Sequence, residues 1–149
     1  MDSNHEIMKS KILIEALSFL GIAEVKGKED NQKIIDMFIS LGFTGFKDET
    51  PWCAAYVGSV LKTCKLDYLQ TLHARDYLEY GKRTNKPVVG DIVVMWRGDV
   101  SSTLGHVAFY LHMDTKYVYV LGGNQSNTVS VQTYKRDRVL SFREAVLPA

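Results

Sequence analysis

The stretch of sequence that decides the fold is Thr50-Pro51-Trp52-Cys53-Ala54-Ala55-Tyr56-Val57. It predicts a turn that leads directly into an amphipathic helix, because the apolar residues after Cys53 lie at helical spacing along one stripe. These residues are Tyr56, Val57, Val60, Leu61 and Cys64. Thr50 is the expected N-cap and Pro51 the expected first helical residue, which places Cys53 in the first turn.

The position of Cys53 makes it a candidate nucleophile. Unpaired backbone N–H groups and the positive end of the helix dipole favour a thiolate in the first turn of a helix. The alternative is a buried structural cysteine, and residues further along the chain distinguish the two. The second cysteine, Cys64, lies about 16 Å further along the helix axis, so the two sulfurs cannot form a disulfide.

Length and composition indicate one globular domain over residues 1–149, with 46% hydrophobic and 23% charged residues. The net charge of +1 argues against a dedicated nucleic-acid-binding protein. Two cysteines without a CxxC pair exclude a disulfide framework, and no His/Cys/Asp/Glu spacing fits a zinc motif, so we expect no metal and no cofactor. The non-basic start, Met1 to Glu6, and the absence of a long apolar run predict neither a signal peptide nor a membrane span.

Helical patterns come first and strand patterns second. Helices are expected at residues 7–20, at residues 31–42 with Asn31 as N-cap, and at residues 73–80, and a polar connection at residues 23–30. Strands are expected at residues 91–96, 106–113, 117–121 and 128–134, with residues 122–127 as a loop and residues 139–143 as an edge strand. Helices followed by an antiparallel meander indicate an α+β fold.

Charged side chains away from these elements have open interpretations. Asp48 and Glu49 precede the cysteine helix and are able to hold a substrate amine or a basic partner; the favoured alternative is that both are solvated and stabilise the helix N-terminus. Lys135, Arg136 and Arg138 form a basic cluster, interpreted as a solvated edge or as a contact for an anionic surface.

Three polar residues fall at the ends of predicted elements. Cys53 begins a helix, His106 begins a strand, and Asn124 follows the next strand in a Gly-Gly-Asn-Gln turn. A thiol nucleophile needs a base to take its proton, and the base needs a third group to orient its ring. Cysteine, histidine and a side-chain amide in this order indicate nucleophilic catalysis.

Four motifs together resemble the CHAP and NlpC/P60 superfamily of papain-like cysteine peptidases and amidases that cut peptidoglycan. They are Pro51-Trp52-Cys53-Ala54-Ala55-Tyr56-Val57, Gly90-Asp91-Ile92-Val93, Gly105-His106-Val107-Ala108-Phe109-Tyr110 and Gly122-Gly123-Asn124-Gln125. The likeness covers nearly the whole chain and points to a compact branch common in bacteriophage lysis proteins and bacterial cell-wall hydrolases. It implies a papain-like NlpC/P60–CHAP fold, with N-terminal helices packed on an antiparallel sheet of five to six strands.

The resemblance also implies roles for individual residues. Cys53 would be the nucleophile, His106 its base and Asn124 the residue that orients the His106 ring, with Gln125 as the nearest rival of Asn124. The backbone N–H of Cys53 is the natural donor to the oxyanion.

The same resemblance suggests roles for three further residues. Trp52 is a candidate wall of the substrate cleft, with a core position as the alternative. Glu49 is a candidate substrate contact. Asp91 lies in the Gly-Asp turn, for which we favour a structural role at the start of the strand.

The resulting hypothesis is a monomeric peptidoglycan hydrolase that cleaves an amide bond of the wall peptide through a thioester acyl-enzyme. Whether it is an amidase or an endopeptidase stays open. The chain would be made in the cytoplasm without a signal peptide, without stable membrane insertion and without a separate wall-binding domain. It would reach the wall through a phage holin or a secretion machine. The alternatives are an antibacterial amidase toxin with an immunity protein as partner, a non-catalytic module that binds wall peptides, and an intracellular thiol protease.

Overall fold

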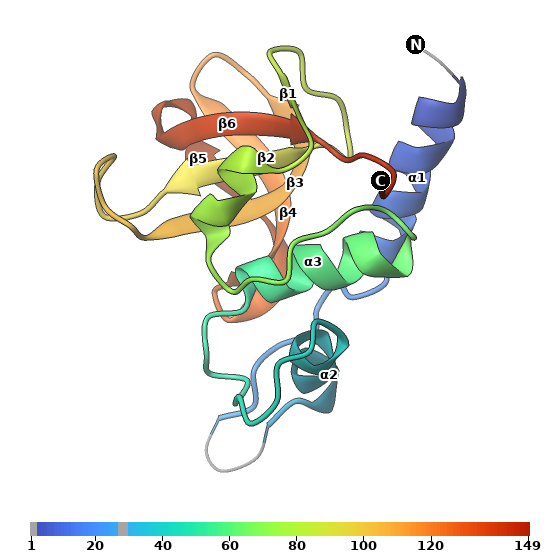
Figure 1. Ribbon diagram of the computed structural model, residues 1–149. Coiled ribbons are helices and arrows are strands. Elements are labelled where there is room, and N and C mark those ends of the chain that lie inside the picture. Colours follow the sequence, from blue (N-terminus) through green and yellow to red (C-terminus); the bar gives the residue numbers. More distant parts are fainter. Residues whose placement is uncertain (1–2, 27–29) are drawn as a thin grey trace.

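The computed structural model describes residues 3–26 and 30–149. Residues 1–2 of the expected N-terminus and residues 27–29 of the expected polar connection lie outside the described part. The α-helices, labelled in Figure 1, are α1 (Ser3–Leu17), α2 (Gln32–Ser40) and α3 (Cys53–Thr63), and the 3₁₀ helix η1 spans Ala74–Glu79. None of the described helices is both long and apolar enough to cross a membrane.

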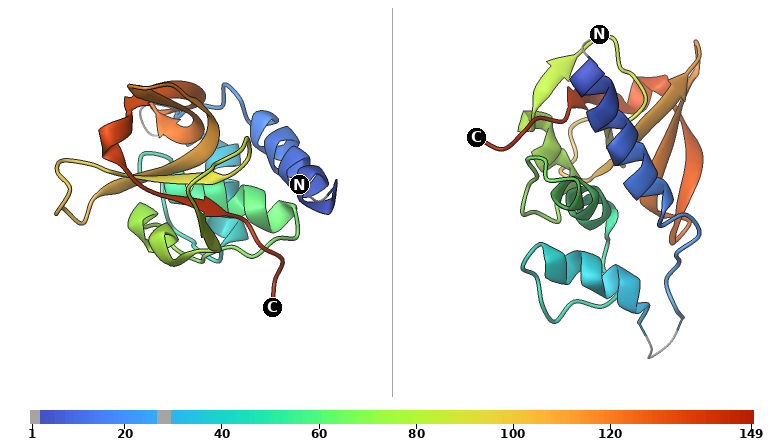
Figure 2. Two further views of the ribbon diagram at one scale, coloured as in Figure 1. Left: turned by 90° about the horizontal axis from the view of Figure 1, so that it is seen from above. Right: turned by 90° about the vertical axis from the view of Figure 1, so that its right-hand side faces the viewer.

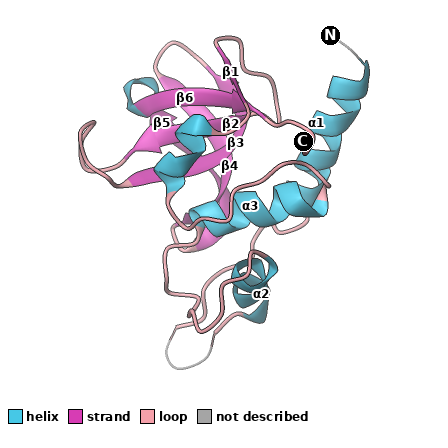
Figure 3. Ribbon diagram, in the orientation of Figure 1, coloured by secondary structure: helices cyan, strands magenta, loops and turns pink. Residues whose placement is uncertain are grey.

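The strands form one six-stranded antiparallel sheet in the order β1-β6-β2-β3-β4-β5. Their bounds are β1 (Lys82–Thr84), β2 (Ile92–Trp96), β3 (Gly105–Met113), β4 (Tyr117–Gln125), β5 (Thr128–Lys135) and β6 (Val139–Glu144), with a 3₁₀ turn, η2 (Arg136–Arg138), before β6. Figure 3 shows the three α-helices, α1, α2 and α3, gathered on one side of the strands. This arrangement confirms the predicted α+β fold.

Helix α3 is the centre of the molecule. Every residue from Cys53 to Leu61 is buried, because α3 packs on β3 and β4 while α1 and α2 contact its other sides (Figure 1). The small residues Ala54, Ala55 and Gly58 bring neighbouring elements close to the helix axis, and an added Cβ on Gly58 would lie 3.0 Å from Leu41 Cδ1. The predicted apolar stripe is therefore part of a helix that is buried on all sides.

The start of α3 differs from the expectation. The helix begins at Cys53 itself, with Trp52 as N-cap, and the backbone N–H of Tyr56 donates to Trp52 O at 2.9 Å. The N-cap assignment of Thr50 is wrong, because no side-chain bond caps α3 and Pro51 lies outside the helix. The correction places Cys53 at the first helical position, where its own N–H has no intrahelical acceptor.

Asp48 is buried, and the interpretation of this residue as solvated is wrong. Its Oδ2 accepts hydrogen bonds from the backbone N–H of Val25 at 2.8 Å and of Asn31 at 2.7 Å. The predicted N-cap of α2 is confirmed, since Asn31 Oδ1 accepts from Lys33 N at 2.9 Å. Asp48 therefore binds both described parts of the connection between α1 and α2.

The sheet order corrects the expectation for the last strand. β6 is not an edge strand, because it pairs with β2 on one side and with β1, which the sequence pattern did not reveal, on the other. The two further views in Figure 2 show β6 leading into a C-terminal segment that leaves the sheet. The expected fourth helix is a 3₁₀ helix, η1, that contacts β2, β3 and β6.

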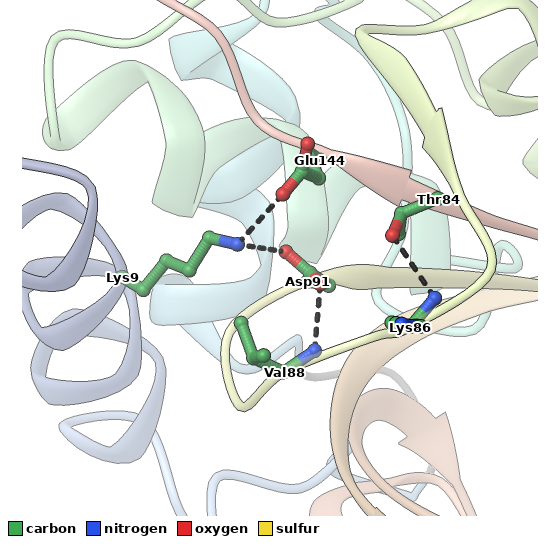
Figure 4. A network of polar contacts seen from close by, with 6 residues as sticks. All are labelled: Lys9, Thr84, Lys86, Val88, Asp91 and Glu144. Carbon is green, nitrogen blue, oxygen red and sulfur yellow. Dashed lines mark hydrogen bonds and ion pairs between the residues drawn. The ribbon is translucent and has the colours of Figure 1, made fainter. Parts of the chain in front are cut away.

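A buried ion cluster ties α1 to the sheet (Figure 4). Lys9 Nζ lies 2.9 Å from Asp91 Oδ1 and 3.0 Å from Glu144 Oε1, and the Lys9 and Asp91 side chains are almost completely buried. Asp91 Oδ2 also accepts from Val88 N at 2.8 Å, which confirms the predicted role of Asp91 at the start of β2. The cluster thus joins α1, β2 and β6.

Candidate active site

The thiol of Cys53 lies at the junction of α3 and the sheet. Cys53 is only 6% exposed, and its sulfur accepts hydrogen bonds from the backbone N–H groups of Val107 on β3 and of Ala54 on α3. Burial raises the pKa of Cys53, although these N–H groups and the charge of Arg97 lower it. The expected thiolate is therefore corrected to a neutral thiol in the resting site, because burial outweighs the helix N-terminus.

The imidazole of His106 is on β3, at the residue directly before Val107. It is 3% exposed, and its ring centroid lies 5.5 Å from that of Tyr134 on β5. Burial lowers the pKa of His106 to about 4, opposed by its bond to Gln125 and assisted by the charges of Arg97 and Arg138. At neutral pH the imidazole is uncharged and able to accept a proton.

The side-chain partner of His106 is Gln125. His106 Nε2 lies 2.9 Å from Gln125 Oε1, and Tyr134 donates its hydroxyl to the same oxygen at 3.2 Å. Gln125 Nε2 donates to Ser130 O at 2.6 Å. The amide is thus held on both sides, in a buried position on the last residue of β4.

These bonds define which nitrogen of His106 carries the proton. The NH₂ group of Gln125 is directed to the carbonyl of Ser130, so the atom facing His106 is an oxygen that can only accept. His106 Nε2 is therefore the protonated nitrogen of the neutral ring. Nδ1 keeps its lone pair and is the atom available as a base.

Asn124 does not occupy this position. It has a left-handed backbone conformation with φ of 57°, and within the described part of the chain its side chain makes no hydrogen bond. The pairing of β4 with β5 shifts register between Gly122 and Gln125, which turns Gln125 towards His106. The predicted contact between Asn124 and His106 is wrong for this reason, and the rival residue, Gln125, makes it. Residues 122–125 also belong to β4 and not to the expected loop.

The two glycines before Asn124 make this geometry possible. An added Cβ on Gly122 would lie 2.7 Å from Gln125 Oε1 and 2.9 Å from Ala108 Cβ. On Gly123 it would lie 2.7 Å from both Trp52 Cζ3 and Tyr56 Cβ. One glycine therefore leaves room for the Gln125 amide, and the other lets β4 approach α3.

The sequence of this site matches a known family. The CHAP domain model matches residues 45–124, which is more than half of the chain and includes Cys53, His106 and Asn124. The chain belongs to the CHAP domain family. CHAP domains are generally cysteine peptidases or amidases, so membership implies a peptidoglycan-hydrolase type of function with peptidoglycan as the substrate class.

Two solved structures have a fold similar to this CHAP domain. One is a lipoprotein-like NLP/P60-family protein of Staphylococcus aureus subsp. aureus Mu50, with a TM-score of 0.58 and 17% identity over 100% of this chain. The other is the P60 domain of an antigen of M. avium subspecies paratuberculosis, with a TM-score of 0.54 and 13% identity over 97% of this chain and 96% of that domain. These likenesses confirm the predicted NlpC/P60–CHAP fold. The chain spans 43% of the staphylococcal protein, and no curated protein matches its sequence.

Two other residues, Trp52 and Glu49, were predicted to contact the substrate. Trp52 is fully buried and donates its Nε1–H to Glu24 Oε1 at 2.9 Å, so the indole is part of the core of the CHAP domain and does not line a cleft. Glu49 is exposed, and among the described residues no contact joins it to Cys53 or His106. The assignment of Trp52 as a cleft wall is therefore corrected, and the assignment of Glu49 as a substrate contact stays a prediction.

Three residues around the site were not assigned to it from the sequence. Tyr134 supports both Gln125 and the His106 ring, while Arg97 and Arg138 supply positive charge that acts on His106. The alternation of β5 identifies Tyr134 as an inward-facing residue, but not its partner. Arg138 was placed in a solvated basic cluster, whereas it stacks on Tyr134 with 5.3 Å between its Cζ and the ring centroid.

Proposed function

We propose that this CHAP domain hydrolyses an amide bond in the peptide part of bacterial peptidoglycan. Cys53 is the nucleophile, His106 the general base and then general acid, and Gln125 the positioning residue for His106. The observation that carries the proposal is the bond of His106 Nε2 to a Gln125 amide that is itself held by Ser130, which leaves Nδ1 without a hydrogen bond to any described residue. The residue after His106, Val107, donates its backbone N–H to the Cys53 sulfur, so the two side chains belong to one site. The family supplies the substrate class.

The reaction begins from a neutral pair. Burial raises the pKa of Cys53 and lowers the pKa of His106, so neither group is charged before the substrate binds. Nδ1 of His106 takes the thiol proton as the sulfur attacks the amide carbon, and the backbone N–H of Cys53 is placed to donate to the oxyanion. The proton transfer is therefore part of the attack and does not precede it.

The second half of the reaction uses the same residues. The His106 imidazolium donates its proton to the leaving amine, the C–N bond breaks, and a thioester joins the acyl group to Cys53. Water then attacks the thioester with His106 as base. The carboxylic acid leaves, and the Cys53 thiol is regenerated.

The test is mass spectrometry of purified peptidoglycan after digestion by the wild type, Cys53→Ala, His106→Ala and the matched control Cys64→Ala. Cys64 is half-buried on the far end of α3, and its sulfur lies 3.6 Å from Lys11 O. We expect new fragments with the wild type and with Cys64→Ala and none with the other two. Full activity of the Cys53→Ala protein would overturn the proposal. The fragment masses identify the bond that is cut.

The proposed place of action is the bacterial cell wall. Phage-type lysis after holin release and delivery as an antibacterial toxin both need the chemistry described above, so the digest is the first experiment. A small protein that co-purifies with the chain and abolishes wall digestion would favour the toxin.

A further inference from the structure

Two arginines lie next to the candidate active site, and neither forms an ion pair with a carboxylate of the described residues. Arg138 is held rigidly: its Cζ lies 5.3 Å from the ring centroid of Trp96 and 5.3 Å from that of Tyr134. Its Nε and Nη2 donate to Trp96 O at 3.3 Å and 3.1 Å. Nη1 makes no hydrogen bond to any described residue. The guanidinium is therefore fixed in place and retains free donors.

Arg97 approaches the same site from the end of β2. Met95 pairs with His106 in the β2–β3 ladder, and the backbone N–H of Arg97 continues this pairing one residue beyond β2 by donating to Leu104 O at 3.2 Å. Alternation therefore puts Arg97 on the His106 face of the sheet. Its side chain is exposed. Its positive charge lowers the pKa values of Cys53, His106 and Tyr134, so the guanidinium acts on both reacting groups.

The two positive charges are uncompensated. Within the described part of the chain, neither guanidinium forms an ion pair with a carboxylate; the ion pairs there belong to Lys9. The two positive charges repel each other, and both act on the buried imidazole of His106. They therefore disfavour the protonated imidazolium that His106 forms during the reaction. An anion bound between the two arginines would remove both disadvantages.

We propose that Arg97 and Arg138 form a carboxylate-recognition site beside Cys53 and His106, so that the preferred substrate carries a free carboxylate next to the amide bond that is cut. This inference rests on the proposed function. Guanidinium groups bind carboxylates through paired, charge-assisted hydrogen bonds. The bound carboxylate would hold the adjacent amide against the sulfur and offset the positive charge around the imidazolium as it forms.

The experiment uses two synthetic peptides that contain the bond identified in the wall digest. They differ only in the carboxyl group nearest to that bond, which is free in one and amidated in the other. The wild type should cleave the free acid with a kcat/KM about 10- to 100-fold higher than the amide. Arg97→Gln should lower this ratio by about tenfold, mainly through the acid substrate, because charge-assisted bonds are lost.

Control variants distinguish a loss of carboxylate recognition from a loss of structure and from a failure of the proposed function. Arg83→Gln makes the same chemical change on β1, where Arg83 is exposed at the other edge of the sheet, and should leave the ratio unchanged. Arg138→Lys keeps the charge but loses the planar donors, and should lower the ratio while cleavage of the amide is retained. Equal rates of the wild type on both peptides, or an equal loss on both peptides in Arg97→Gln, would overturn the inference and leave the proposed function intact. Failure of the wild type to cleave either peptide would overturn the inference that the adjacent carboxylate directs cleavage, whereas the proposed function is tested separately by the wall digest.

Discussion

Replacement of Gln125 by alanine tests the arrangement of the site most directly. The Gln125 side chain makes hydrogen bonds to His106, Ser130 and Tyr134 and is 3% exposed. Alanine removes the acceptor of the His106 Nε2 proton, so the ring is no longer held in the tautomer that exposes Nδ1 to the thiol. The proposed role therefore predicts a loss of kcat with the fold retained.

The size of the loss has two limits. The lower limit is the loss of one buried hydrogen bond to His106, about 1.4 kcal/mol, or a factor of about 10 in rate. The upper limit is the whole contribution of general acid–base catalysis, a factor of about 10² to 10⁴. We expect a value between these limits. Unpaired groups at Ser130 and Tyr134 should also lower the free energy of unfolding by about 1–3 kcal/mol.

The assay compares the initial rate of wall-peptide cleavage with the fraction of folded protein, measured by circular dichroism at the same temperature. Asn124→Gly is the matched control, because it removes the neighbouring amide at a φ of 57° that glycine adopts without strain. Its kcat should stay within about twofold of the wild type, since the Asn124 side chain makes no hydrogen bond to a described residue.

Gln125→Glu adds a readout that a purely structural role would not change. A carboxylate next to His106 favours the imidazolium and raises its pKa from about 4. The acidic limb of kcat/KM should therefore lie near pH 4 in the wild type and at higher pH in the variant. A Gln125→Ala protein with full activity, or an Asn124→Gly protein that loses more activity than Gln125→Ala, would refute the assignment.

Three further predictions concern buried charge. Lys9→Met should lower the free energy of unfolding by about 3–5 kcal/mol in urea denaturation, because Asp91 stays buried without its cation; a loss below about 1 kcal/mol would contradict the ion cluster. Ultraviolet titration of the Cys53 thiolate in a Cys64→Ala background should give a pKa above the ordinary value of 9.0. A pKa below neutrality would contradict the neutral thiol and show that the resting site holds a Cys53 thiolate. Since the pKa of His106 falls from 6.5 to about 4 on folding, the unfolded chain binds the extra proton between these values. Stability should thus decrease as pH falls from 6.5 to 4, by up to about 3 kcal/mol, and an identical slope in His106→Gln would exclude this cause.

Local patterns were sufficient to predict the main elements. The apolar stripe after Cys53, the cap at Asn31 and the apolar run after Asp91 each depend on neighbours within a few residues, and each predicted its helix or strand. His106 was likewise assigned to a strand end by the residues that follow it. These features needed no knowledge of distant contacts.

The choice between Asn124 and Gln125 could not be made locally. A shift of one residue in a strand reverses the face on which each side chain lies, and the irregular pairing between β4 and β5 provides that shift. Both residues are amides of similar chemistry, so composition does not distinguish them. The positive φ of Asn124 is the backbone conformation that accompanies the register shift, and Asn is one of the residue types that tolerate this conformation.

The burial of polar side chains could not be predicted from sequence patterns either. Lys9 and Asp48 look like surface residues because each depends on partners far along the chain: Lys9 on Asp91 and Glu144, and Asp48 on Val25 and Asn31. The position of β6 within the sheet has the same origin. Its pairing with β2 and β1 joins residues that are between 44 (Met95 and Val139) and 62 (Lys82 and Glu144) positions apart in sequence, which no short-range periodicity encodes.

The internal position of β6 has a consequence for the order of events on the ribosome. β2 is made long before β6, and until residues 139–144 leave the exit tunnel one side of this apolar strand has no partner. An unpaired apolar edge readily joins other chains. A nascent chain that stalls or is truncated after β5 would therefore be prone to aggregate. Of the three residues in the ion cluster, Glu144 is made last, so the charge balance around Lys9 and the pairing of β2 are completed together.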